Sequence, residues 1–173
     1  MRLKNFNRTD DLFSLCGLNC GLCGYHLQGR CNGCFKDSSC AKTCPMAPCS
    51  VKHGGLQYCF ECPEYPCRHY DGFDSYDTLV LHRNQRRDMQ KAKEIGMDAY
   101  HAEQLEKKDI LNQLLESYDD GSKASFFCLA VNMIELSDLR DILSQLNSQC
   151  LNIPLSEKAK QAEKALRDCS EQQ

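Results

Sequence analysis

The stretch CGLNCGLCGYHLQGRCNGC, residues 16–34, decides how the first part of this chain can fold. It holds five cysteines, and two of the gaps between them have the spacing Cys-x-x-Cys. A third pair with this spacing follows in CFECPEYPC, residues 59–67. Such a spacing lets two thiolates converge on one tetrahedral ion. Because apolar residues are sparse here, we expect metal to hold this part of the chain together.

Eleven of the 14 cysteines lie between residues 16 and 67. Among those that belong to no Cys-x-x-Cys pair, Cys16 and Cys40 are alternatively buried thiols that touch no metal. We take all eleven as candidate metal ligands: Cys16, Cys20, Cys23, Cys31, Cys34, Cys40, Cys44, Cys49, Cys59, Cys62 and Cys67.

The expected cellular compartment favours metal over disulfides. The N-terminal sequence MRLKNFNRTDD has no apolar segment of a secretory signal, so we expect a cytoplasmic protein. Disulfides do not persist in that reducing compartment, and zinc is the usual ion of cysteine-rich modules there. Since zinc takes about four ligands, we expect two or three ions. Among the nearby imidazoles of His26, His53 and His69, the last lies nearest in sequence to a cysteine.

An iron–sulfur cluster is the alternative. The run Cys16-x3-Cys20-x2-Cys23 has the spacing with which radical S-adenosylmethionine enzymes hold a [4Fe–4S] cluster. No alternation of strands and helices follows it, as the partial barrel of those enzymes would require. The sequence CAKTCP, residues 40–45, is similar to the end of the bacterial ferredoxin run, but Asp37 occupies the position of a further cysteine. These gaps favour zinc.

Taken together, the cysteine runs resemble a widespread bacterial and archaeal family of cysteine-rich domains with no assigned activity. The family pattern is similar to CGL-x-C-x2-C, C-x-G-C, C-x4-C and C-x2-C-x2-aromatic-Pro-Cys. The resemblance implies a metal-binding, specifically a zinc-binding, protein. It covers most of 12–70 and, less closely, the helical stretch 114–143, and its patterns fall on residues 16–25, 31–34, 44–49 and 59–67.

We expect a metal-stapled module of loops and short elements over 12–70, followed by an all-α bundle over 71–173. The first 70 residues carry eight Lys and Arg against five Asp and Glu, whereas the remainder carries 13 against 19. Apolar residues at i, i+3, i+4 and i+7 predict amphipathic helices in the second region. The expected helices run over 74–95, from 98 through 118, over 122–133, from 137 through 146 and from 156 through 169.

One basic stretch, LHRNQRRDMQKAK at 81–93, suggests a binding face. It could bind nucleic acid, with the aromatics Tyr65, Tyr70, Phe73 and Tyr76 stacking on bases. The net charge of −3 gives no general attraction to nucleic acid, so we expect these cations to pair with the surplus carboxylates of the other helices instead. The cations concerned are Arg83, Arg86, Arg87, Lys91 and Lys93.

The remaining patterns exclude several classes of function. We find no phosphate-binding loop, no His-Glu-x-x-His and no Gly-x-Ser-x-Gly. The longest apolar run, from Phe126 to Val131, is too short to span a bilayer, so we expect no membrane partner. The sequence therefore predicts a zinc-binding, non-enzymatic module that binds an unidentified protein partner, with a redox protein or metalloenzyme using Cys16, Cys20 and Cys23 as the alternative.

Overall fold

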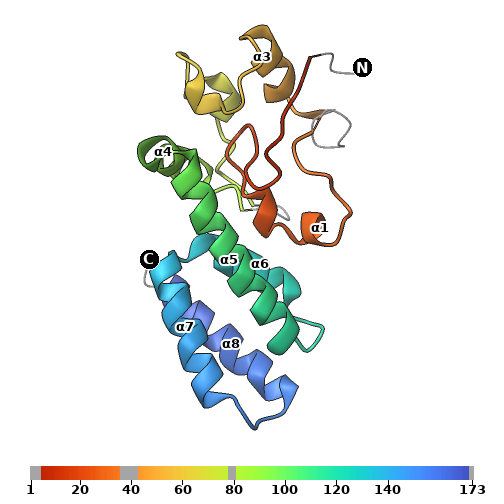
Figure 1. The fold of residues 1–173 in the computed structure, drawn as a ribbon, viewed down its shortest axis with the longest axis vertical. Coiled ribbons are helices and arrows are strands. Elements are labelled where there is room, and N and C mark those ends of the chain that lie inside the picture. The colour runs from red at the N-terminus through yellow and green to blue at the C-terminus, as the bar shows by residue number, and fades with distance from the viewer. Residues whose placement is uncertain (1–4, 36–42, 78–80, 172–173) are drawn as a thin grey trace. The chain divides into compact units, whose positions relative to one another are not determined.

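The computed structural model describes residues 5–35, 43–77 and 81–171, so that Cys40 lies outside the described residues. Over these ranges the chain is helical and contains no strand (Figure 1). It divides into two compact units, Met1–Ala102 and Glu103–Gln173. The all-helical character predicted for the second region is therefore confirmed.

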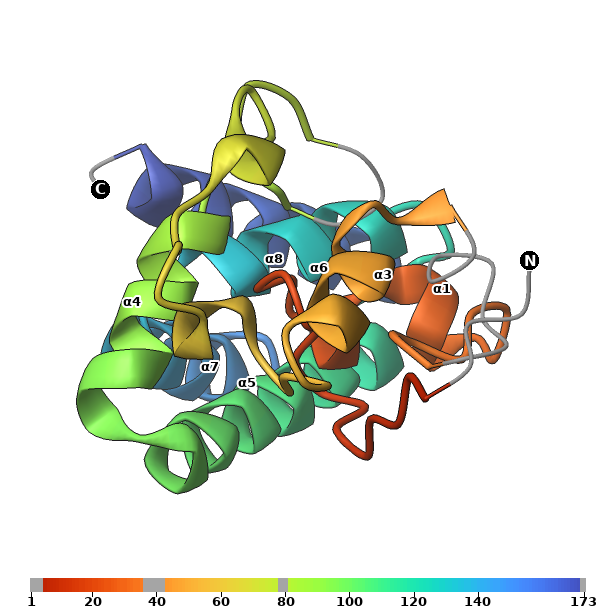
Figure 2. The ribbon, with the colours of Figure 1, turned by 90° about the horizontal axis from the view of Figure 1, so that it is seen from above.

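The first unit consists mainly of loops joined by short helical turns, as Figures 1 and 2 show for the segments around α1 and α3. Among the described residues, no helix before α4 exceeds the seven residues of α3. Its elements within the described ranges are η1 Cys20–Leu22, α1 Gly24–Leu27, α3 Met46–Lys52, η2 Cys59–Glu61, η3 Arg68–Tyr70 and α4 Gln85–Ile95.

Two of the Cys-x-x-Cys pairs adopt the same 3₁₀ turn. The backbone N–H of Cys23 donates to the carbonyl of Cys20 at 3.0 Å, and that of Cys62 donates to Cys59 at 3.0 Å. Side chains three residues apart lie on one side of such a turn. The backbone therefore presents the two thiols of each pair in a common direction, which is the property for which the spacing was singled out.

Two small clusters form the interior of the first unit, and cysteines belong to one of them. In most domains aliphatic side chains fill such positions. The first cluster contains Phe6, Leu15, Cys16, Leu18, Cys34, Met46, Ala47 and Tyr70, and the second contains Phe13, Tyr58, Met89, Ala92 and Tyr100.

Helix α4 is shorter than the sequence predicts, because it begins at Gln85 rather than near residue 74. The carboxylate of Asp77 accepts the backbone N–H groups of residues 82 and 83 at 2.9 and 3.2 Å, which holds them in a turn ahead of the helix. The C-terminal end is as predicted. Gly96, with φ +83°, stops the helix after Ile95.

The helices of the second unit follow the predicted pattern closely. Helix α5 begins in the first unit and continues into the second, and within the second unit α8 packs against both α6 and α7. Tyr118 donates to Asn147 at 2.8 Å and so ties α5 to α7. No helix in the described part of the chain has the length and apolarity needed to cross a membrane. The bounds are α5 Met97–Ser117, α6 Ala124–Met133, α7 Leu136–Gln149 and α8 Leu155–Ser170.

Candidate metal centre

Five thiols of the first unit lie in or against its buried cluster. Cys16 and Cys34 are 5% and 3% exposed and belong to the cluster, and Cys44, Cys59 and Cys67 pack against it. All five are free thiols. We call Cys16, Cys34, Cys44 and Cys59 the inner set and treat Cys67 with the cavity that it lines.

The charges of the inner set act on one another. Burial raises the pKa of the Cys16 thiol well above its usual range, and the charges of Cys44, Cys34 and Cys59 affect it further, each in the same direction. Burial likewise raises the pKa of Cys59 to about 12. Because thiolates are the form that binds metal, these groups ionise together only if a cation joins them. As they stand, no three His, Cys, Asp or Glu side chains of the described residues form a ready-made metal site. Binding would therefore have to draw the sulfurs inward.

Hydrogen-bond donors face three of the four sulfurs. The hydroxyl of Ser14 lies 3.3 Å from the sulfur of Cys16, and the backbone N–H of the residue before Cys16 bonds to Cys34. The Tyr70 hydroxyl donates to the carbonyl of Cys16 at 3.1 Å, and its hydrogen bonding with Cys59 lowers the pKa of that thiol. Donors of this kind stabilise a thiolate, so the surroundings suit sulfur ligands of a metal.

A buried arginine lies beside the inner set with two nitrogens unused. Arg8 donates to the carbonyl of Phe13 at 2.7 Å, lies 4.0 Å from a carboxylate oxygen of Asp10 and has its guanidinium carbon 5.0 Å from the ring centre of Tyr58. Its Nε and Nη1 are buried without a hydrogen-bond partner among the described groups. Burial raises the pKa of Cys34, and the positive charge of Arg8 partly opposes that rise.

The charge of Arg8 bears most directly on whether a zinc ion fits among the thiolates of the inner set. A zinc ion held by four thiolates carries a net charge of about −2, and a buried charge is costly unless it is compensated. Arg8 supplies a buried positive charge and free donors at that place. The inner set and Arg8 therefore fit a zinc–tetrathiolate centre, in which the four cysteines would hold the ion.

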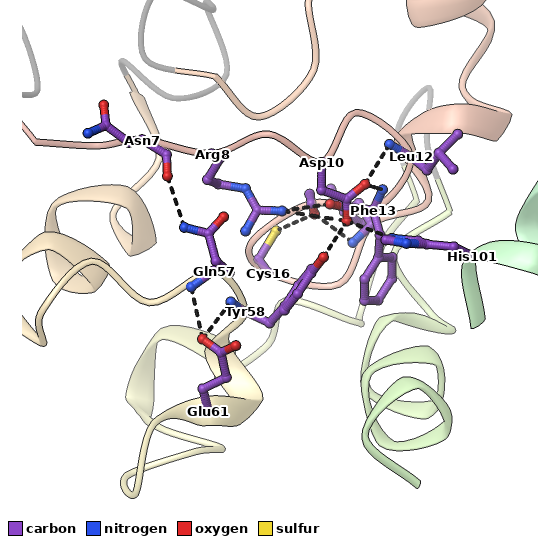
Figure 3. A network of polar contacts seen from close by, with 12 residues as sticks. Asn7, Arg8, Asp10, Leu12, Phe13, Cys16, Gln57, Tyr58, Glu61 and His101 are labelled. Atoms are coloured by element: carbon purple, nitrogen blue, oxygen red, sulfur yellow. Dashed lines mark hydrogen bonds and ion pairs between the residues drawn. The ribbon is translucent and has the colours of Figure 1, made fainter. Parts of the chain in front are cut away.

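A carboxylate fixes the loops that carry the inner set. Asp10 accepts the backbone N–H groups of Leu12 and Phe13 at 2.9 and 3.1 Å, the hydroxyl of Tyr58 at 2.7 Å and a contact from Nε2 of His101 at 2.9 Å (Figure 3). Burial alone would raise the pKa of Asp10, but these hydrogen bonds bring it below its usual value. The network joins the segment before Cys16 to the segment before Cys59.

Four thiols, Cys49, Cys59, Cys62 and Cys67, line a neighbouring cavity of about 30 Å³. We call the three that lie outside the inner set, Cys49, Cys62 and Cys67, the outer set, and the cavity wall also contains His53 and His69. Burial raises the pKa of Cys49, and the charges of Cys67 and then Cys62 raise it further.

The other sequence candidates lie on either side of α1. Cys20 and Cys23 lie on the η1 turn and Cys31 lies in the loop after α1, while Cys40 is outside the described residues. The Cys16, Cys20 and Cys23 cluster of the iron–sulfur alternative stays a prediction.

The basic face of α4 is largely engaged with its own unit. Tyr70 is 1% exposed, so its ring cannot stack on a base as the sequence suggested, and the partly buried ring of Phe73 packs on the same cluster. Arg86 also donates to the carbonyl of Tyr70 at 2.6 Å. Arg83 pairs with Asp77, Arg86 with Asp74 and Arg87 with Asp88. These carboxylates lie in the loop before α4 or on α4 itself, and not on other helices as the sequence analysis expected.

The sequence pattern missed the residues that surround the sulfurs. Ser14 and Arg8 lie in a loop with no recognisable spacing, and Tyr70 was taken for a base-stacking residue. The one available signal was the position of Ser14, two residues before Cys16, which is close enough for a side-chain contact.

Comparison with known proteins does not extend these observations. No protein-family model matches the chain, and neither does any curated protein or any solved structure. The resemblance to a cysteine-rich family therefore remains a prediction, and the geometry of the thiols has to support the functional argument.

Proposed function

We propose that this protein binds zinc through its N-terminal cysteines and acts as a non-enzymatic interaction module. The observation that carries the proposal is the inner set of four thiols, two of them buried, with donors on three sulfurs and the unpaired nitrogens of Arg8 beside them. Four thiolate ligands complete the coordination of zinc and leave no open position for a substrate or water, which is typical of structural sites.

The first unit has little regular secondary structure and a small apolar interior, which supports a structural role for the ion. Before α4, its longest described helix has seven residues, and two small clusters form its interior. A segment built in this way gains much of its folding free energy from the metal when metal is bound. The loops held by the ion would then present a fixed surface to a protein partner, in the cytoplasm where the thiols stay reduced.

The alternative is an iron–sulfur, redox or catalytic metal protein that uses Cys16, Cys20 and Cys23. Four cysteines can also hold such a cluster, so ligand type alone does not separate the two. The cavity of about 30 Å³ beside the thiols suits one ion better than a multi-atom cluster, because one water-sized body needs about 10–15 Å³. A nucleic-acid role for α4 is less supported, since its arginines already have carboxylate partners.

Elemental analysis with a visible absorption spectrum tests the proposal directly. The full chain is purified without air and without a histidine tag, and we expect two or three zinc ions per chain and no colour. Iron with sulfide and a brown colour would instead establish the alternative. A chain without bound metal, even after anaerobic addition of zinc, would exclude both readings.

Variants then connect the metal to the inner set. Cys34→Ser should lower the zinc content by about one ion, because an alcohol does not replace a thiolate as ligand. The matched control is Cys150→Ser, at a buried thiol of the second unit whose hydrogen bond to Gln161 a hydroxyl can keep. Equal zinc in both variants would show that the inner set does not bind the ion.

A further inference from the structure

Helix α3 places a histidine at ligand distance from a cysteine of the outer set. Cys49 and His53 are four residues apart and therefore lie on one helix face. The sulfur of Cys49 is 3.6 Å from Nδ1 of His53. Zinc binds sulfur at about 2.3 Å and imidazole nitrogen at about 2.0–2.1 Å, so a tetrahedral ion holds these two atoms about 3.5–3.6 Å apart. The pair already has the spacing of two ligands on one ion.

The other two thiols of the outer set face the same cavity from a different segment. Cys62 and Cys67 line it together with Cys49 and His53, although Cys62 lies nine residues beyond the histidine. The volume of about 30 Å³ has room for one ion. Three thiolates and one imidazole form a common structural zinc site.

The second ring nitrogen of His53 lies near a carboxylate. Nε2 is 3.8 Å from a carboxylate oxygen of the exposed Glu64, which is an ion-pair distance and too long for a hydrogen bond. A small shift of the Glu64 side chain would form that hydrogen bond, which orients the ring and raises its basicity as a ligand. In the metal-free geometry Nδ1 also contacts the carbonyl oxygen of Cys49 at 3.0 Å, a contact that metal binding would replace.

We propose that Cys49, His53, Cys62 and Cys67 form a second zinc site beside the inner set. The inference rests on the proposed function, because both require zinc. It differs from the sequence expectation, which favoured His69. That histidine lines the same cavity, but its ring makes no comparable approach to a sulfur within the described ranges. The inner and outer sets together supply the ligands of two four-coordinate ions.

Competition with a chromophoric chelator on the zinc-loaded full chain tests the second site. His53→Ala should weaken one of the bound ions by more than the roughly 10–100-fold that loss of an outer-shell partner costs. Glu64→Gln should weaken the same ion within that smaller range. The matched control is His69→Ala, for which we expect the affinities of the parent. An unchanged affinity in His53→Ala, or an equal loss in His69→Ala, would overturn the assignment.

If His53→Ala folds poorly, a variant that replaces the histidine ligand by a thiolate still tests the second site. His53→Cys should retain the ion, and in the cobalt-substituted protein its thiolate-to-cobalt absorption at this site should rise by about one third, because three sulfur ligands become four. An unaltered cobalt spectrum would refute the site. A parent chain that binds no zinc at all would instead reject the proposed function, so the two failures are distinguishable.

Discussion

Replacing Asp10 by alanine should destabilise the first unit by about 3–5 kcal/mol. The Asp10 side chain is 7% exposed and accepts the two backbone N–H groups of Leu12 and Phe13 and the hydroxyl of Tyr58. Each buried donor left without a partner costs about 1–3 kcal/mol, so three donors give at least about 3 kcal/mol. Water entering the vacated space limits the upper end.

The charge of Asp10 makes part of this contribution depend on pH. Its pKa is lowered in the folded protein, because the hydrogen bonds outweigh the effect of burial. A lowered carboxyl pKa stabilises the fold at pH values above the unfolded pKa of about 3.9, and this stabilisation is lost as the pH falls through the folded pKa. Asp10→Asn should therefore cost about 1–2 kcal/mol near neutral pH, and the difference from the parent should shrink below about pH 4.

Urea unfolding followed by tyrosine fluorescence measures these effects. Six of the seven tyrosines lie in the first unit, so the signal reports mainly on that unit. Parent and variant are compared at each pH with excess zinc, because acid also protonates the thiols and releases metal from both. Asp11→Asn, at an exposed neighbouring carboxylate, should stay within about 0.5 kcal/mol of the parent. A loss below about 1 kcal/mol in Asp10→Ala would refute the reasoning.

Two further predictions concern the surroundings of the inner set. Gly17→Ala should destabilise the first unit by about 2–4 kcal/mol in the same urea assay, because Gly17 has φ +96° and an added methyl group would meet the side chain of Met89. Gly29→Ala, at φ +68° with open space around it, should cost only about 1–2 kcal/mol, and equal losses would contradict the packing argument. Arg8→Leu should weaken the inner zinc ion by about 10–100-fold in the chelator competition, because the positive charge that opposes the rise in the pKa of Cys34 on burial is removed. Arg8→Lys should recover part of that loss, and a leucine variant with parental affinity would show that the arginine serves packing alone.

The helices of the second unit were predictable because their signals are local. The apolar spacing on α7 and α8 identifies the buried faces that the structure confirms, including Leu139, Leu146, Ala162 and Leu166. The chain turns at Gly121, which has φ +93°, as the sequence Asp-Asp-Gly predicts. In each case the residues that decide the structure lie within one or two helical turns of one another.

The division of the thiols could not be predicted, because it depends on contacts between distant segments. Cys16 and Cys59 are 43 positions apart in the sequence and share one buried cluster. Spacing finds pairs such as Cys59 with Cys62, which line one cavity in the structure, but it does not find the shared cluster of Cys59 with Cys16. The start of α4 at Gln85, later in the sequence than predicted, has a similar origin. It depends on the backbone N–H groups ahead of the helix that the Asp77 side chain accepts.

The position of Cys59 has a consequence for how metal would be taken up. Its thiol responds to Cys44 of the inner set and also to Cys67 and Cys49 of the outer set. An ion bound by either set would replace thiol protons by a centre of net negative charge, and so change the charge that the other set meets through this residue. The two binding equilibria are therefore thermodynamically linked, and a zinc titration of the parent chain measures their coupling free energy as the difference in affinity between the first and the second ion.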